Sequence, residues 1–115
     1  MEWSREENRI YARDAAGKLL AEVTFPALET LKKSFPKEAL AKLTPISGEE
    51  KRGVVVIDHT FVDDSLRGQG RAGELMLACR EELLASGRAA IPLCPYAVAW
   101  FKKHPEKADV VALKD

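Results

Sequence analysis

Residues 66–73 read Leu66-Arg67-Gly68-Gln69-Gly70-Arg71-Ala72-Gly73, and this loop decides which fold the chain can adopt. A strand is predicted before the loop, because residues 54–62 begin with the continuous β-branched run Val54-Val55-Val56-Ile57. A helix is predicted over residues 71–86, because apolar side chains recur on one stripe and Gly87 suits the C-terminal cap. The loop therefore joins a buried strand to a helix N-terminus, where backbone N–H groups can bind phosphate.

The glycine spacing fits two patterns, and the first is the dinucleotide-binding fingerprint Gly68-x-Gly70-x-x-Gly73. An acidic residue should follow that fingerprint about twenty positions later. Residues 88–93 occupy this place and contain no acid. A chain of 115 residues is also too short for a dinucleotide-binding domain together with a substrate domain. The sequence therefore argues against a dinucleotide-binding domain.

The second pattern is Arg67-x-x-Gly70-x-Ala72, in which glycines expose the backbone before a helix and Arg67 and Arg71 add positive charge. Such a loop suits a pyrophosphate, and each contact with the helix dipole contributes about 0.3–1 kcal/mol at an exposed site. The loop resembles the coenzyme A pyrophosphate signature of the GNAT acetyltransferase superfamily. It also lies in the order of strand, loop and helix that this superfamily requires.

The resemblance is closer to the short single-domain GNAT-like proteins. It extends over residues 9–26 and 53–111, and besides the loop it includes Asp58-His59-Thr60-Phe61-Val62, Cys94-Pro95-Tyr96, Trp100-Phe101 and His104-Pro105. It implies a minimal GNAT-like α+β fold: a mixed α/β sheet, mostly antiparallel, with a splayed parallel strand pair and flanking helices. We expect a single domain over residues 1–115. Residues 27–52 are expected to form one or two short helices in an insertion that the resemblance does not explain.

Hydrophobic patterning predicts the other elements. Residues 9–14 and 19–25 predict a hairpin with one buried face. Residues 89–93 predict a strand, and Pro92 in it cannot donate to a ladder, which indicates a gap beside that strand. Pro95 suits the first turn of a further helix. Residues 110–113 are expected to form a last strand.

The same resemblance implies acetyl-CoA as the cofactor. Its pantetheine arm would lie between the strand ending at Val62 and the strand ending at Leu93, beside Cys94. A backbone N–H near Phe61 or Val62 would hold the thioester oxygen, where negative charge grows in the transition state. A primary amine, on a small molecule or a protein, would attack the thioester directly. The pyrophosphate would bind the loop residues Arg67, Gly68, Gln69, Gly70, Arg71 and Ala72.

His59 is the candidate general base, because an amine with a pKa of about 10.4 must lose a proton before it attacks. On strict alternation His59 shares a face with Val55, Ile57 and Phe61. A structural histidine, half-buried in the sheet, is therefore an equally good interpretation. Tyr96 is a further polar candidate near the thioester.

Cys94 is predicted at the N-cap of the helix that begins at Pro95, and a helix N-terminus favours the thiolate form of a cysteine. A covalent acetyl-cysteine route is therefore open, but a cysteine that caps the helix or packs against the pantetheine is the simpler interpretation. Phe101 stands where many GNAT enzymes have a catalytic tyrosine, and it cannot donate a proton. Lys102, Lys103 and His104 are interpreted as charges that suit a helix C-terminus.

Composition disfavours several other classes of protein. Eighteen basic and eighteen acidic residues give a net charge of zero, which argues against a broad nucleic-acid-binding surface. The two cysteines and two histidines suggest no metal site, and so few cysteines suit a reducing cytosol. No apolar run approaches membrane-spanning length, so we expect a cytoplasmic protein with no membrane partner.

Two other functions stay open beside acetyl transfer. A non-catalytic coenzyme A-binding module would keep the loop and would explain Phe101. Recognition of RNA phosphates by Arg67 and Arg71 is disfavoured by the charge balance. The sequence does not predict an oligomeric state.

Overall fold

The strands β2 (Arg9–Arg13) and β3 (Leu19–Thr24) form the antiparallel hairpin that the sequence predicts. The computed structural model describes residues 2–31 and 53–111 of the chain. Ile10 and Ala12 of β2 lie opposite Val23 and Ala21 of β3, and all four side chains are buried. The other described elements are β1 (Ser4–Glu6), α1 (Leu28–Leu31), β4 (Val54–Ile57), β5 (His59–Val62), a 3-10 turn (Asp64–Leu66), α3 (Arg71–Ser86), β6 (Ala89–Pro92), α4 (Pro95–Lys103) and a 3-10 helix (Pro105–Val110).

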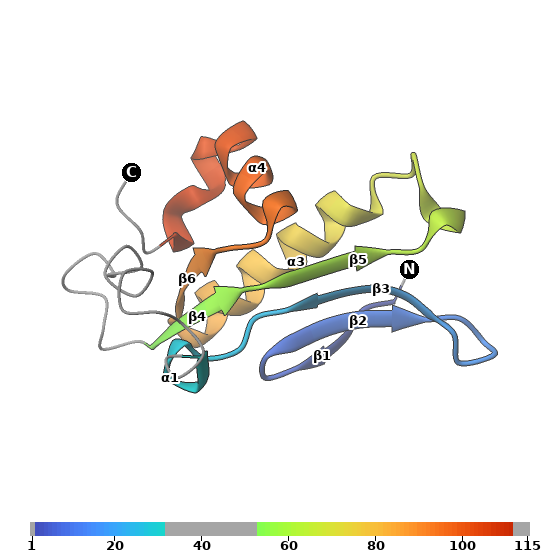
Figure 1. Cartoon of the computed structure of the whole chain (residues 1–115), viewed down its shortest axis with the longest axis horizontal. Coiled ribbons are helices and arrows are strands. Elements are labelled where there is room, and N and C mark those ends of the chain that lie inside the picture. The colour runs from blue at the N-terminus through green and yellow to red at the C-terminus, as the bar shows by residue number, and fades with distance from the viewer. Residues whose placement is uncertain (1, 32–52, 112–115) are drawn as a thin grey trace.

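The described strands form two hydrogen-bonded groups. The strands β1, β2, β3 and β5 make an antiparallel sheet in that order, whereas β4 pairs with β6 in parallel. Figure 1 shows β4 leading into β5, with β6 beside β4 and with α3 along the sheet. The structure therefore confirms the predicted α+β fold, mostly antiparallel with one parallel pair.

Asp58 divides the strand that the sequence predicts over residues 54–62. His59 lies opposite Thr24, and the N–H of Asp58 also donates to the Thr24 carbonyl, at 3.3 Å. Two residues of one strand thus oppose one residue of its partner, which is the arrangement of a β-bulge. The Thr24 hydroxyl donates to Asp58 Oδ1 at 2.6 Å and holds the extra residue in place.

The bulge reverses which side chains of β5 face the core, compared with strict alternation from Ile57. Thr60 lies opposite Val23, which is buried in the same cluster as Val55 and Ile57. Because side chains alternate along a strand, His59 points to the other face of the sheet, away from that cluster. The prediction that His59 shares a face with Val55 and Ile57 is therefore wrong, and the cause is the single extra residue at position 58.

The helix α3 has the bounds that the sequence predicts, and Gly87 ends it. Gly87 adopts a left-handed conformation (φ 69°), and its N–H donates to the last-turn carbonyls of Leu83 and Leu84. The helix packs on the face of the sheet that Val23 and Val55 share. Its buried side chains are Leu75, Met76, Ala78, Cys79 and Leu83. Burial raises the pKa of Cys79 to about 12, so this thiol is a packing group, as predicted.

The parallel pair ends where β6 reaches Pro92. Ile57 lies opposite Pro92, and the N–H groups of Leu93 and Cys94 both donate to the Ile57 carbonyl, at 3.0 Å. Beyond this point the chain from β6 enters α4, whereas β5 continues beside β3. Within the described residues β5 has β3 as its one strand neighbour, so its other edge faces the start of α4.

Three other expectations differ from the structure or fall partly outside it. Val110 ends a 3-10 helix and Val111 makes a single bridge with Ala90, so the strand predicted over residues 110–113 is wrong at these positions. The strand β1 was not predicted, because its three residues are polar and exposed. Of the insertion expected at residues 27–52, the structure describes residues 27–31, which include the short helix α1. Residues 32–52 lie outside the described residues.

Neither a membrane span nor a metal cluster occurs among the described residues. None of the helices there is long and apolar enough to cross a membrane. No three histidine, cysteine or carboxylate side chains of the described ranges converge as metal ligands would.

Candidate active site

The glycine loop reaches α3 through two left-handed glycines. Gly68 has φ 79° and Gly70 has φ 73°, a conformation that residues with a Cβ rarely adopt. A Cβ at either position would meet no atom within 4 Å, so the requirement is conformational and not one of space. Gly70 is the N-cap of α3 and offers no side-chain hydrogen bond. The first N–H groups of α3 are therefore free of a side-chain cap and face the loop.

Asp63 anchors the loop at its start. Its carboxylate accepts hydrogen bonds from the Ser65 hydroxyl at 2.6 Å and from the Ser65 N–H at 3.1 Å. These bonds, hydroxyl first, lower the pKa of Asp63, and Lys18 lowers it further. The loop is thus held by a carboxylate that precedes it, while the helix end behind it stays uncapped.

A pocket of about 280 Å³ lies at this helix end. Predicted cofactor residues make up most of its wall, and Leu66, Gly73 and Tyr96 complete it. Gln69 does not line it; the side-chain amide of Gln69 donates to the Ser65 carbonyl at 3.3 Å. The predicted residues in its wall are Val62, Arg67, Gly68, Gly70, Arg71 and Ala72.

The two arginines of the loop differ in their surroundings. Arg67 is exposed and pairs with Asp64 at 3.0 Å. Arg71 is mostly buried, and its Nη1 contacts both carboxylate oxygens of Glu74, at 2.9 and 3.0 Å. The Nε of Arg71 is buried and has no hydrogen-bond partner among the described residues. A buried donor without a partner costs about 1–3 kcal/mol, so this group fits an anion that would turn the guanidinium toward the pocket.

The free edge of β5 presents backbone groups next to the pocket. The N–H of Asp63 donates to the Leu20 carbonyl at 2.8 Å, which makes these two residues a hydrogen-bonded pair. In an antiparallel pair such residues alternate with residues whose backbone groups point away. Phe61 therefore faces β3, whereas the N–H groups of Thr60 and Val62 face the free edge. Of Phe61 and Val62, the two residues near which a donor to the thioester oxygen is expected, only Val62 has an N–H that faces the free edge.

A sequence profile of the GCN5-related N-acetyltransferases matches residues 37–110. The chain belongs to this family. The match confirms the superfamily that the loop resembles and supports acetyl transfer as the class of reaction. No curated protein gave a significant match.

Two solved structures share this fold with the chain. One is a GCN5-like protein from Staphylococcus aureus assigned as an N-acetyltransferase, with 24% identity and a TM-score of 0.65; the match covers 99% of this chain and 90% of that one. The other is a ribosomal-protein-alanine N-acetyltransferase from Brucella melitensis biovar Abortus, with 17% identity and a TM-score of 0.52. That match covers 93% of this chain and 64% of the other, so the chain spans less than two thirds of that relative.

The three candidate catalytic residues of this family member do not meet at one point. Tyr96 lines the pocket, and desolvation raises the pKa of its hydroxyl. His59 lies on the other face of the sheet, half exposed, with Nε2 3.4 Å from Glu22 Oε1. Glu22 in turn pairs with Arg9. His59 thus lies in a row with Glu22 and Arg9 on the face of the sheet opposite α3, here called the open face.

Cys94 caps α4, as the simpler interpretation of the sequence predicts. Its Sγ accepts the Ala97 N–H at 3.4 Å and lies 3.2 Å from the Thr60 hydroxyl. The side chain is buried and does not line the pocket at the α3 N-terminus. Phe101 is buried in the core against Trp100, with ring centroids 5.2 Å apart, so α4 offers no proton donor at that position.

Sequence reasoning missed a second cleft, of about 520 Å³, between α3 and α4. Lys103 and His104, interpreted as helix-end charges, belong to its wall, as does Lys107. The spacing of four residues between the two lysines was a usable signal, but only the packing of α4 against α3 shows that a cleft lies between them.

Proposed function

We propose that the protein is an acetyl-CoA-dependent N-acetyltransferase that moves an acetyl group to a primary amine by direct attack on the thioester. The observation that carries this proposal is the uncapped N-terminus of α3, reached through left-handed Gly68 and Gly70, in a member of the GCN5-related family. Helix N–H groups and the helix dipole favour an anion at this place.

The residues of the pocket fit the pyrophosphate of coenzyme A. Backbone N–H groups of the first turn of α3 would hold its oxygens, since no side chain competes for them. Arg71 would supply its unpartnered Nε, and Arg67 would add charge from the rim. Bound acetyl-CoA supplies the reactive thioester.

The chain's own contribution to acetyl transfer is orientation and charge stabilisation. The free edge of β5, with the N–H groups of Thr60 and Val62, would hold the pantetheine amides, and a backbone N–H of this edge would donate to the thioester oxygen as negative charge develops there. A thiol with a pKa of about 8.5 leaves readily as thiolate, so the absence of a proton donor at Phe101 is compatible with turnover.

We place the acceptor amine on the open face of the sheet. The bulge at Asp58 turns His59 to this face, where its imidazole would take the proton of the attacking amine. Glu22, 3.4 Å from His59 Nε2, would stabilise the imidazolium that results. Acceptor and cofactor would thus reach the β5 edge from opposite sides of the sheet.

The test has two stages. Acetyl-CoA should raise the unfolding temperature of the protein, and free thiol should then appear when amines are added. Failure to stabilise the protein at saturating acetyl-CoA would remove the cofactor from the proposal. Stabilisation without thiol release from any amine of a broad panel would favour the alternative, a non-catalytic coenzyme A-binding module.

A further inference from the structure

Arg9 lies on the open face of the sheet and has no role in the chemistry described so far. The strand register places Glu22 as a diagonal neighbour of both Arg9 and His59, with Thr24 between those two. Diagonal neighbours lie within reach of long side chains. Two cross-strand rows make up this part of the face: Glu6, Arg9, Thr24 and His59 form one, and Ser4, Tyr11, Glu22 and Phe61 form the next.

The Glu22 carboxylate meets Arg9 and His59 with different oxygens. Arg9 Nε donates to Oε2, whereas His59 Nε2 lies 3.4 Å from Oε1. Thr24 does not compete for Glu22, because its hydroxyl donates to Asp58 at 2.6 Å. The Glu22 side chain is only 14% exposed, so water and salt screen these contacts less than they would on an open surface. A change at Arg9 is therefore transmitted to His59 through one carboxylate.

Arg9 is held in place from three strands. Its guanidinium carbon lies 3.9 Å from the centre of the Tyr11 ring on β2, and its Nη1 lies 3.8 Å from Glu6 on β1. The bond to Glu22 adds a contact on β3. Ion pairs between freely exposed side chains contribute little, but the Arg9 side chain is only 25% exposed and packs flat on a ring. Arg9 is therefore a fixed positive charge beside Glu22.

This fixed charge changes what Glu22 offers to His59. While the imidazole is neutral, Arg9 and Glu22 balance each other. When the imidazole takes a proton, Glu22 has to serve two cations. Without Arg9, an unpaired carboxylate 3.4 Å away would attract the imidazolium and keep His59 protonated to higher pH. A general base has to be unprotonated before its substrate arrives, so Arg9 favours the form that can act.

We propose that Arg9 is a positioning residue for acetyl transfer, which holds Glu22 against His59 and offsets its charge so that the imidazole stays free to accept a proton. The inference rests on the proposed function, in which His59 is the base. The Nε2–H group of His59 faces Glu22, and Nδ1 takes the proton that the amine releases. Of the described groups around this imidazole, which are Glu22 and Thr24 of β3, Asp58 in the bulge and Arg9 beyond Glu22, only Arg9 is a cation.

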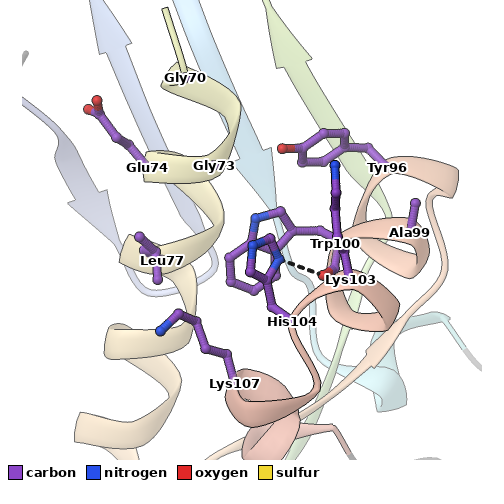
Figure 2. A pocket seen from close by; sticks show the side chains of 10 residues that line it. All are labelled: Gly70, Gly73, Glu74, Leu77, Tyr96, Ala99, Trp100, Lys103, His104 and Lys107. Carbon is purple, nitrogen blue, oxygen red and sulfur yellow. Dashed lines mark hydrogen bonds between the residues drawn. The ribbon is translucent and has the colours of Figure 1, made fainter.

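The first experiment needs neither cofactor nor amine. The chain has two histidines, so the imidazole of His59 can be titrated by NMR with His104 as an internal reference. In R9Q the midpoint of the His59 titration should rise by about 0.5–1 pH unit, because one positive charge near the imidazole is removed. R9K keeps the charge and should restore most of the original midpoint. His104 packs against Trp100 between α3 and α4, as Figure 2 shows, and should not respond.

R13Q is the matched control for R9Q. Arg13 lies two residues further along β2, and its guanidinium carbon is 5.4 Å from the centre of the same Tyr11 ring. It donates to the Gly17 carbonyl and contacts no carboxylate in the described part of the chain. R13Q removes the same charge from the same strand but leaves Glu22 paired, so the His59 midpoint should stay where it is.

The second experiment measures acetylation of a primary amine against pH. In R9Q the acidic limb of kcat/KM for the amine should move up with the His59 midpoint, which lowers kcat/KM about three- to tenfold on that limb. The KM for acetyl-CoA should change less than about twofold, because Arg9 lies on the face opposite α3. If Arg9 only stabilised the sheet, R9Q would lower the unfolding temperature and the rate at every pH without moving the limb.

The outcomes separate this inference from the proposed function. A His59 midpoint that is unmoved in R9Q, or that moves equally in R13Q, overturns the role of Arg9 and leaves the acetyl-CoA proposal standing. Failure of R9K to restore the midpoint overturns it too, because charge is what R9K keeps. A midpoint that moves while the acidic limb does not overturns the role of Arg9 in acetyl transfer. If the unmodified protein acetylates no amine, the proposed function falls and the role of Arg9 falls with it.

Discussion

The helices α3 and α4 begin beside the same free edge of β5 but treat their first N–H groups differently. At α4, Cys94 Sγ accepts the N–H of Ala97, and Pro95 in the first turn has no N–H to satisfy. At α3, Gly70 supplies no side chain at all. A helix that satisfies its own first turn has little to offer an anion, whereas one that begins at a bare glycine presents both donors and dipole. The comparison locates the cofactor at α3 in the proposed function and gives α4 a structural start.

Gly70→Ala should have the largest effect, because it alters the uncapped start of α3 directly. A Cβ at φ 73° costs about 1–2 kcal/mol, and it also disturbs N–H contacts of about 0.3–1 kcal/mol each. We expect a loss of about tenfold or more in acetyl-CoA affinity by calorimetry, with lower stability in urea. Gly53→Ala is the matched control, because Gly53 has φ 81° and equally open surroundings and lies before β4, at the opposite end of the β4–β5 segment from the loop. An equal affinity loss in both variants would contradict a special role for the α3 N-terminus.

Cys94→Ala should have a smaller effect, and on stability alone. Loss of an N-cap typically costs about 0.5–2 kcal/mol, and a thiol is a weak acceptor, so we expect the lower end of that range in urea unfolding. Cys94→Ser keeps a capping atom and should restore stability. Acetyl transfer should persist in both variants if the amine attacks the thioester directly. Turnover lost in both variants, at normal acetyl-CoA affinity, would instead show a covalent acetyl-cysteine route.

Ser65→Ala should have the smallest effect, on the Asp63 carboxylate that anchors the start of the loop. The Ser65 hydroxyl and N–H lower the pKa of Asp63 below 3.8, so this carboxylate supports the loop above that pH and the support is lost as pH falls through the lowered pKa. The variant should move the Asp63 pKa up toward 3.8 in an NMR titration. Ser86→Ala, at the far end of α3, should leave the Asp63 pKa unchanged. An unmoved Asp63 pKa in Ser65→Ala would assign the shift to the Ser65 N–H, which the variant keeps, and to Lys18.

The bounds of α3 were predictable because local signals agree there. Its apolar stripe has helical spacing, and Gly87 takes the left-handed cap that such a residue favours. The loop before it was readable for the same reason, since glycines at two left-handed positions leave a direct mark in the sequence. Elements whose residues satisfy several local requirements at once are the ones that sequence reasoning found.

What was missed depends on contacts between distant segments. The bulge at Asp58 is invisible in a run that is β-branched on both sides, because it is defined by the pairing of β5 with Thr24. The strand β1 carries no apolar pattern and exists through its pairing with β2. Val110 and Val111 look like a strand by composition, yet Val110 ends a 3-10 helix that begins at Pro105. The cleft between α3 and α4 is created by the packing of the two helices, so Lys103 and His104 in its wall were interpreted as helix-end charges.

The bulge at Asp58 decides which side chains of β5 face the core. If the chain kept all its residues but formed no bulge, strict alternation from Ile57 would turn His59 and Phe61 inward and expose Thr60 and Val62. Deleting Asp58 alone would instead leave a regular strand in which Ile57 and Thr60 stay on one face. In this part of the chain the loss of that one residue should therefore preserve the two faces of β5, whereas the insertion of a further residue would require a second irregularity.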